Sequence, residues 1–172
     1  MKLKQLYLLL FAICLASFSI SCKRAKTTHS VSKYSNKNGK ELETDELIQK
    51  AKKHIGTKYR LGGKEPNQGF DCSGFTCYMF AKFNITLPPT AILQAETGWA
   101  VSANEADKGD LIFFKGENAS SSKIGHVGII VSDKGKYPIE FIHASSSKGI
   151  MISSLKESYF QKRFVKIRRV RS

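Results

Sequence analysis

Three residues of this sequence have side chains suited to nucleophilic catalysis: Cys72, His126 and His143. Cys72 lies in the segment GFDCSGF, residues 69–75, where its neighbours are small and polar rather than apolar. A thiolate can attack a carbonyl, and an imidazole can take the thiol proton and return it to a leaving amine. A third polar group must hold that imidazole in the right tautomer. We therefore predict Cys72 as nucleophile, His126 as general base and acid, and His143 as the orienting residue.

The nucleophile is expected at the beginning of a helix. A helical pattern runs from about Cys72 to Phe83, and Asp71 precedes it as a suitable N-cap. The N-terminus of a helix favours a thiolate, and its backbone N–H groups can bind a developing oxyanion. The Asp71 carboxylate raises the pKa of a neighbouring thiol by charge repulsion, so its expected role is capping or substrate binding rather than activation of the thiol.

The histidines are expected on neighbouring strands. Residues 126–131 and 138–143 both alternate like strands, and the turn sequence DKGK separates them. If they form an antiparallel pair, both imidazoles fall near the same end of the hairpin. We predict that they lie side by side and face the helix that carries Cys72.

The same residue types also have structural roles, because a cysteine beside a helix is usually a small buried residue and a strand histidine is often a hydrogen-bonded core or surface residue. One cysteine and two histidines can bind zinc, but Cys72 and Cys77 point about 140° apart around a helix, which disfavours both a shared metal and a disulfide. Cys77 is expected to be a small buried residue. The prediction is therefore a site without metal or cofactor.

The remaining pattern places helices first and strands second. The segment TDELIQKAKKHIG predicts a helix that begins at Thr44 and ends at Gly56, with an apolar stripe that includes Ile55. A short helix is expected after LPPT. Five strands are then predicted in the segments GDLIFF, IGHVGIIVS, IEFIHAS, GIMISSL and RFVKIRRV. This order favours an α+β fold with an antiparallel sheet.

The N-terminal part of the sequence predicts export. Residues 1–21 combine a basic start, a short apolar run and small residues, and Cys22 stands where bacterial lipoproteins accept lipid. Residues 23–43 are polar and are predicted to be a flexible linker to a domain at 44–172. The net charge of +14 could suit nucleic acid. An exported protein is instead expected to meet anionic membranes or wall polymers, so no nucleic-acid partner is predicted.

The ordered motifs YRLGG, GFDCSGF, GDLIFF, GHVGII and FIHASSSKGI resemble the NlpC family of papain-like bacterial cell-wall peptidases. The resemblance implies a papain-like fold, with a nucleophile helix packed on a five- or six-stranded antiparallel sheet. It assigns the catalytic roles to Cys72, His126 and His143. It also implies that Tyr59, Asp71 and Ser73 contribute to substrate binding.

The function implied by the resemblance is a cysteine endopeptidase that cuts an amide bond in peptidoglycan stem or cross-link peptides. The candidate bond joins γ-D-glutamate to the diamino acid, and the reaction passes through an acyl-enzyme on Cys72. The expected protein is a monomer in the cell envelope, lipid-anchored to a membrane and facing the periplasm or the wall. One rival function is an amidase or acyltransferase on the same fold. A second rival is a wall-binding lipoprotein without catalysis.

Overall fold

The computed structural model describes residues 44–118 and 120–170. The predicted export signal, the lipid-acceptor Cys22 and the linker at 23–43 lie outside these residues and stay predictions. Within the described ranges, no helix has both the length and the apolar character needed to cross a membrane.

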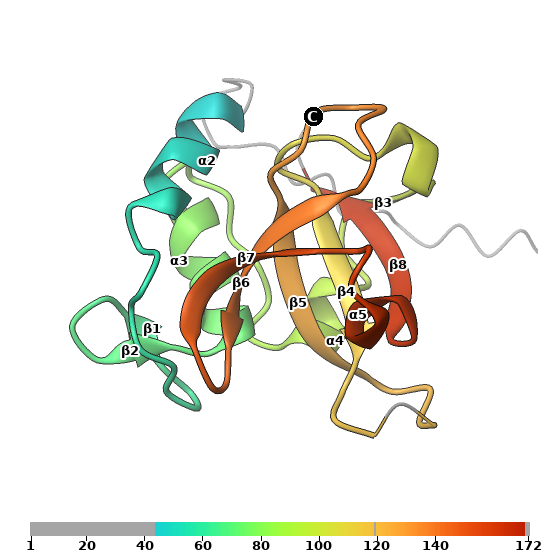
Figure 1. The fold of residues 1–172 in the computed structure, drawn as a ribbon. Coiled ribbons are helices and arrows are strands. Elements are labelled where there is room, and N and C mark those ends of the chain that lie inside the picture. The colour runs from blue at the N-terminus through green and yellow to red at the C-terminus, as the bar shows by residue number, and fades with distance from the viewer. Residues whose placement is uncertain (1–43, 119, 171–172) are drawn as a thin grey trace, which may run out of the picture. The chain divides into compact units, whose positions relative to one another are not determined.

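The described chain forms a few short helices and one main sheet (Figure 1). The helices are α2 (Thr44–Lys52), α3 (Cys72–Ala81), α4 (Ala91–Gln94), α5 (Ser158–Gln161) and the 3-10 turn η1 (Ala103–Glu105). The strands are β1 (Lys64–Glu65), β2 (Gly69–Phe70), β3 (Trp99–Val101), β4 (Leu111–Lys115), β5 (Ile124–Ile130), β6 (Glu140–Ser145), β7 (Gly149–Ser154) and β8 (Phe164–Arg169).

The main sheet has six strands in the order β3-β8-β4-β5-β6-β7, and every neighbouring pair is antiparallel. The α+β prediction with a five- or six-stranded antiparallel sheet is confirmed. All five strands expected from the sequence form. The edge strand β3 and the short helix α5 were not predicted, because segments of three and four residues are too short to show a clear periodicity.

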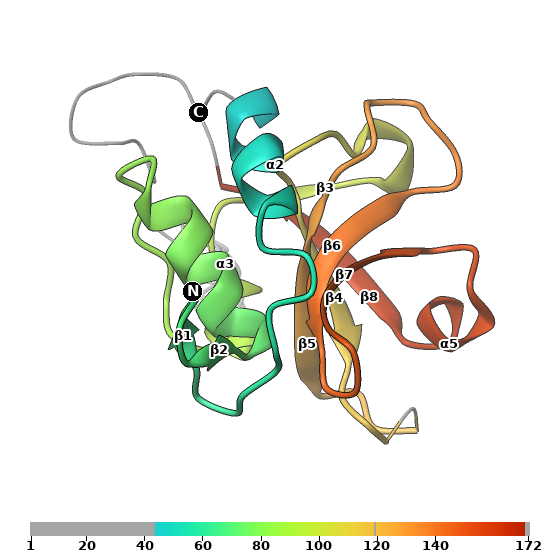
Figure 2. The same ribbon diagram turned by 60° about the vertical axis from the view of Figure 1, so that its left-hand side comes forward.

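Helices cover both faces of the sheet. Figure 2 shows α2 and α3 on one side and α5 on the other. Because side chains alternate along a strand, each strand contributes to two clusters. One joins α2 and α3 to Val127, Ile129, Ile142 and Ala144 of β5 and β6. The other joins Ile130 and Phe141 of the same strands to Phe160 of α5.

The pairing of β5 with β6 is short. Only Ile129↔Ile142 and Ile130↔Phe141 are paired, although β5 begins at Ile124 and β6 continues to Ser145. Beyond these pairs the first half of β5 and the last half of β6 are not joined by a ladder. The helix α3 packs against both β5 and β6.

The helices end earlier than the sequence predicted. α2 ends at Lys52, and a turn with Gly56 at φ +88° follows. Ile55 therefore lies outside the helix and is 52% exposed, which corrects its predicted place in the apolar stripe. α3 ends at Ala81 instead of Phe83, and Asn84 follows with a positive φ of 59°. Asparagine tolerates this left-handed conformation, which stops a helix.

The glycines of YRLGG and GFDCSGF allow two backbone segments to touch. A Cβ added at Gly74 would lie 2.1 Å from the carbonyl oxygen of Gly63. A Cβ added at Gly63 would itself lie 2.3 Å from the carbonyl oxygen of Gly69. The first turn of α3 is thus seated directly on the preceding loop, and no side chain fits between them.

This close approach predicts the effect of Gly74→Ala. In an exposed helix this change stabilises by about 1 kcal/mol. Here the clash with backbone dominates, and we expect a loss of about 2–3 kcal/mol in the free energy of unfolding. Urea denaturation measures it. Gly116→Ala is the control, because a Cβ there meets only the Gly125 Cα at 3.7 Å. Equal stability of the two variants would contradict the packing argument.

Candidate active site

Asp71 fixes the beginning of α3. Its Oδ1 accepts a hydrogen bond from the backbone N–H of Gly74 at 2.6 Å, and its Oδ2 accepts one from the N–H of Gly62 at 2.8 Å. The hydroxyl of Ser73 lies 3.2 Å from the same Oδ1. The predicted N-cap is confirmed. It ties the helix and the preceding loop together, so that Cys72 occupies the first helical position.

The surroundings of Cys72 favour the protonated thiol over the thiolate. Burial raises its pKa, and the neighbouring Asp71 carboxylate raises it further. The backbone N–H groups of Val127, Ser73 and Cys72 itself lower it in part. The sulfur lies 4.0 Å from the carbonyl oxygen of Gly125, which can accept the weak S–H hydrogen bond. A base is therefore needed to form the thiolate.

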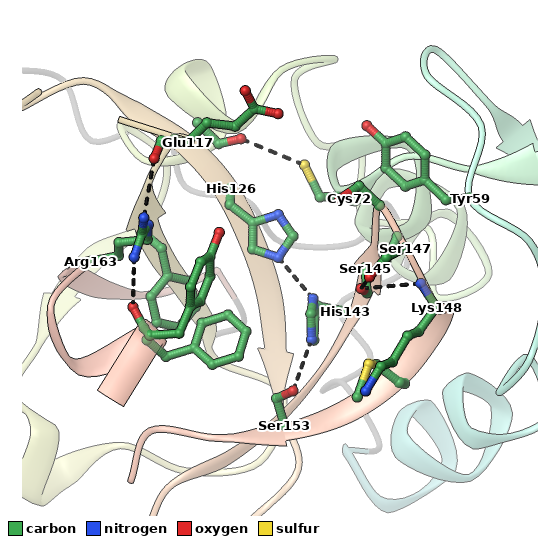
Figure 3. A pocket seen from close by; sticks show the side chains of 18 of the residues that line it. Tyr59, Cys72, Glu117, His126, His143, Ser145, Ser147, Lys148, Ser153 and Arg163 are labelled. Carbon is green, nitrogen blue, oxygen red and sulfur yellow. Dashed lines mark hydrogen bonds between the residues drawn. The ribbon is translucent and has the colours of Figure 1, made fainter. Parts of the chain in front are cut away.

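The two imidazoles are hydrogen-bonded to one another. His126 Nε2 lies 2.9 Å from His143 Nδ1, with the rings nearly perpendicular at 87°. In Figure 3 the ring of His126 lies between Cys72 and His143, and its other nitrogen is on the side towards Cys72. The predicted neighbourhood of the two histidines is confirmed.

The histidines point to the opposite side of the sheet from the one predicted. His143 packs against the rings of Phe141 and Phe160, and His126 against Phe114, all of which belong to the α5 side of the sheet. Only the His126 ring is turned towards α3, at the first residue of that helix, Cys72. Side chains alternate between the two faces along each strand. Val127 and Ile129 on β5, and Ile142 and Ala144 on β6, face α3, so His126 and His143 lie on the other face.

Two features allow residues from opposite sides of the sheet to meet. The Cys72 sulfur, in the first turn of α3, lies 4.0 Å from the carbonyl oxygen of Gly125, which belongs to the part of β5 that does not pair with β6. Gly128 leaves room for the side chain of His143, because a Cβ at position 128 would lie 3.3 Å from His143 Cβ and 2.9 Å from Phe141 Cδ2.

Ser153 extends this hydrogen-bonded chain, and it was not predicted from the sequence. His143 Nε2 lies 3.2 Å from Ser153 Oγ. Ser153 belongs to β7, which pairs with β6. A serine in a strand carries no motif, so only the pairing of β6 with β7 could have identified it.

Both histidines are neutral at physiological pH. Burial lowers the pKa of His126 to about 4. The pKa of His143 falls to about 3, because of burial and then the proximity of His126. A neutral imidazole has one free lone pair and can accept a proton. His126 is thus in the protonation state that a general base requires.

These side chains border a cavity of about 390 Å³. Cys72, His126 and His143 line it together with Tyr59 and Ser153. Figure 3 shows Tyr59 beside the thiol and Arg163 on the far side of the His126 ring. The arrangement provides a thiol, a neutral imidazole and a third polar group at one opening, which is the set that acyl transfer by a cysteine needs.

The comparisons with known proteins agree with this geometry. The NlpC/P60 family model matches residues 56–169. The chain belongs to the NlpC/P60 family. This confirms the resemblance inferred from the motifs, and the matched range contains all the elements from Gly56 to the end of β8.

Two curated proteins are similar in sequence to this chain. The chain is 40% identical over 118 residues to the murein DD-endopeptidase MepS/murein LD-carboxypeptidase of Escherichia coli K12, covering 68% of this chain and 57% of that protein. It is 38% identical over 125 residues to the bifunctional muramidase/DL-endopeptidase CwlT of Bacillus subtilis, covering 73% of this chain and 36% of the relative. The chain thus spans little more than half of the first relative's length.

A solved NlpC/P60 structure has the same fold. The family protein from Bacillus cereus ATCC 10987 superposes with a TM-score of 0.68 at 29% identity. The match covers 76% of this chain and 41% of that protein.

The substrate-binding residues that the resemblance suggested lie in different surroundings. Tyr59 lines the cavity, and burial, followed by the nearby Cys72 and Asp71, raises its pKa. Asp71 and Ser73 do not belong to the cavity lining. The Ser73 hydroxyl donates to the carbonyl oxygen of Pro89 at 2.9 Å, and its residue is 8% exposed. A role in binding stays a prediction for all three residues.

Cys77 has a structural environment. It receives a hydrogen bond from the buried Gln94 side chain at 3.3 Å and lies 3.3 Å from the carbonyl oxygen of Pro88. Among the described residues, no group of three or more His, Cys, Asp or Glu side chains is placed to hold a metal ion.

Proposed function

We propose that this protein is a cysteine endopeptidase of peptidoglycan. The observation that carries the proposal is the His126–His143 hydrogen bond of 2.9 Å beside the Cys72 thiol, at the edge of one cavity. The relatives MepS, named a murein DD-endopeptidase, and CwlT, named a muramidase and DL-endopeptidase, support a peptide substrate of the wall.

The first half of the reaction forms an acyl-enzyme. His126 Nδ1 accepts the proton of the Cys72 thiol, and the sulfur attacks the carbonyl carbon of the peptide bond. The backbone N–H groups near the sulfur, including that of Cys72, stabilise the oxyanion that develops. His126 then gives its proton to the leaving amine, the C–N bond breaks, and the acyl group stays on sulfur as a thioester.

The second half of the reaction restores the enzyme. Water replaces the leaving amine, His126 accepts one of its protons, and the resulting hydroxide attacks the thioester carbon. The C–S bond breaks, the sulfur recovers a proton from His126, and the acid product leaves. No metal or redox cofactor takes part in these steps.

We propose the bond between γ-D-glutamate and the diamino acid as the one that is cut. The names DL-endopeptidase and gamma-DL-glutamyl hydrolase among the relatives support this choice, whereas the name DD-endopeptidase indicates a different bond. Mass spectrometry of digested stem peptides, with and without cross-links, tests it. We expect fragments that end in D-glutamate from both substrates. Cleavage of cross-linked peptides alone would transfer the assignment to the cross-link, and no hydrolysis of either would refute the peptidase.

We propose that a lipid on Cys22 holds the protein at a membrane of the cell envelope. The basis is the order of basic, apolar and small residues before Cys22. A single acyl chain gives only weak membrane binding, so the multiple acyl chains of a lipoprotein would be required. Cell fractionation checks the anchor. Cys22→Ala is expected to leave the membrane fraction, and unchanged membrane association of this variant would refute lipidation at Cys22.

A further inference from the structure

We propose that Ser153 is a positioning residue of the active site. Its hydroxyl accepts a hydrogen bond from His143 and so sets the direction of the hydrogen-bonded chain that ends at His126. Ser153 is 5% exposed, and its Oγ lies 3.2 Å from His143 Nε2. The proposal rests on the proposed role of His126 as the base for Cys72.

The direction of these hydrogen bonds decides whether His126 can act as the base for Cys72. To accept the thiol proton, His126 needs a lone pair on Nδ1, so its own proton must be on Nε2. That proton is donated to His143 Nδ1, at 2.9 Å. His143 then carries its proton on Nε2 and donates it to Ser153 Oγ. A hydroxyl can accept here because its oxygen has two lone pairs.

The charged intermediate permits only this direction. Once His126 holds the thiol proton, both of its nitrogens are protonated and both must donate. His143 Nδ1 must then accept, and the proton on His143 Nε2 again needs an acceptor. Ser153 Oγ supplies that acceptor when the imidazolium forms. One proton has moved from sulfur to His126, and the other protons of the chain have not moved.

The surroundings of His143 make this acceptor necessary. The residue is 3% exposed, and its ring packs against the rings of Phe141 and Phe160, which have no lone pair to offer. Without a hydroxyl at position 153, the Nε2–H would be buried and unsatisfied. The reversed tautomer would then be favoured, with His143 Nδ1–H donating to His126. That tautomer places the proton of His126 on Nδ1, where it cannot accept from Cys72.

A matched pair of variants separates the hydroxyl from the shape of the side chain. Threonine and valine have nearly the same volume, and both suit a strand such as β7. We expect Ser153→Thr to keep kcat on a stem-peptide substrate within about threefold. Ser153→Val should lower kcat about ten- to a hundredfold and leave KM unchanged, because a hydrogen bond serving a charged group is lost. If the added methyl unfolds both, Ser153→Ala replaces the valine variant and wild type replaces threonine.

The tautomer can be measured without any substrate. Long-range ¹H–¹⁵N spectra of the full chain labelled at histidine show which ring nitrogen carries the proton. We expect His143 to be protonated on Nε2 in wild type and Ser153→Thr, and to shift towards Nδ1 in Ser153→Val. A wild-type His143 protonated on Nδ1, or identical tautomers and kcat in the Thr and Val variants, would overturn the proposal. If the wild-type protein hydrolyses no peptide, the proposed function fails, and the spectra still decide the hydrogen bond of Ser153.

Discussion

Replacing Cys72 by alanine is expected to lower the hydrolysis of stem peptides by at least about 10⁴-fold. In the proposed reaction the sulfur forms the covalent bond to the substrate, so the acyl-enzyme cannot form without it. The fold should survive, because the Asp71 cap that begins α3 uses backbone N–H groups and the Ser73 hydroxyl rather than the thiol. Release of peptide fragments, followed by mass spectrometry, measures the loss.

Cys77→Ala is the matched control for Cys72→Ala. Both thiols belong to α3, and neither is in a disulfide. Cys77, however, accepts a hydrogen bond from the Gln94 side chain and does not line the cavity. We expect the control to keep most of its activity. A Cys72→Ala variant with turnover close to that of wild type would remove the basis of the peptidase proposal and would favour a protein that only binds the wall.

Replacing His126 by alanine is expected to lower kcat by about 10³- to 10⁴-fold. The high pKa of the Cys72 thiol makes the base indispensable, because little thiolate forms at neutral pH without it. The same ring also protonates the leaving amine, so both chemical steps are affected. A steady-state assay at pH 7 measures kcat and KM separately, and KM should change little.

His54→Phe is the control for the loss of an imidazole. The ring of His54 packs edge-on against Phe70 and Tyr78 and does not line the cavity, so phenylalanine can replace it. Its activity should match that of wild type. His143→Ala should cost less than His126→Ala, because His143 orients the base and does not touch the substrate. Equal losses in His54→Phe and His126→Ala would show that the effect is one of stability and not of catalysis.

The parts of the site that the sequence determined are local ones. Asp71 accepts from the N–H three residues ahead, which is a capping geometry that depends only on neighbouring residues. The residue pattern therefore located the first turn of α3 and the thiol within it. The strand-like alternation of apolar residues likewise identified β5 and β6 and placed one histidine on each of them. The ordered motifs indicated the family, since several of them occur together in one sequence.

The tertiary structure decided how these pieces meet. The sequence could not show which sheet face α3 covers, so it did not predict that both imidazoles pack on the α5 side while the His126 ring is turned towards Cys72. It also could not show that β5 and β6 pair at only two positions, or that β7 brings Ser153 to His143. Strand register and the choice of face depend on the burial of side chains far apart in the chain. Capping and alternation are fixed within a few residues, whereas this burial is a property of the whole packed domain.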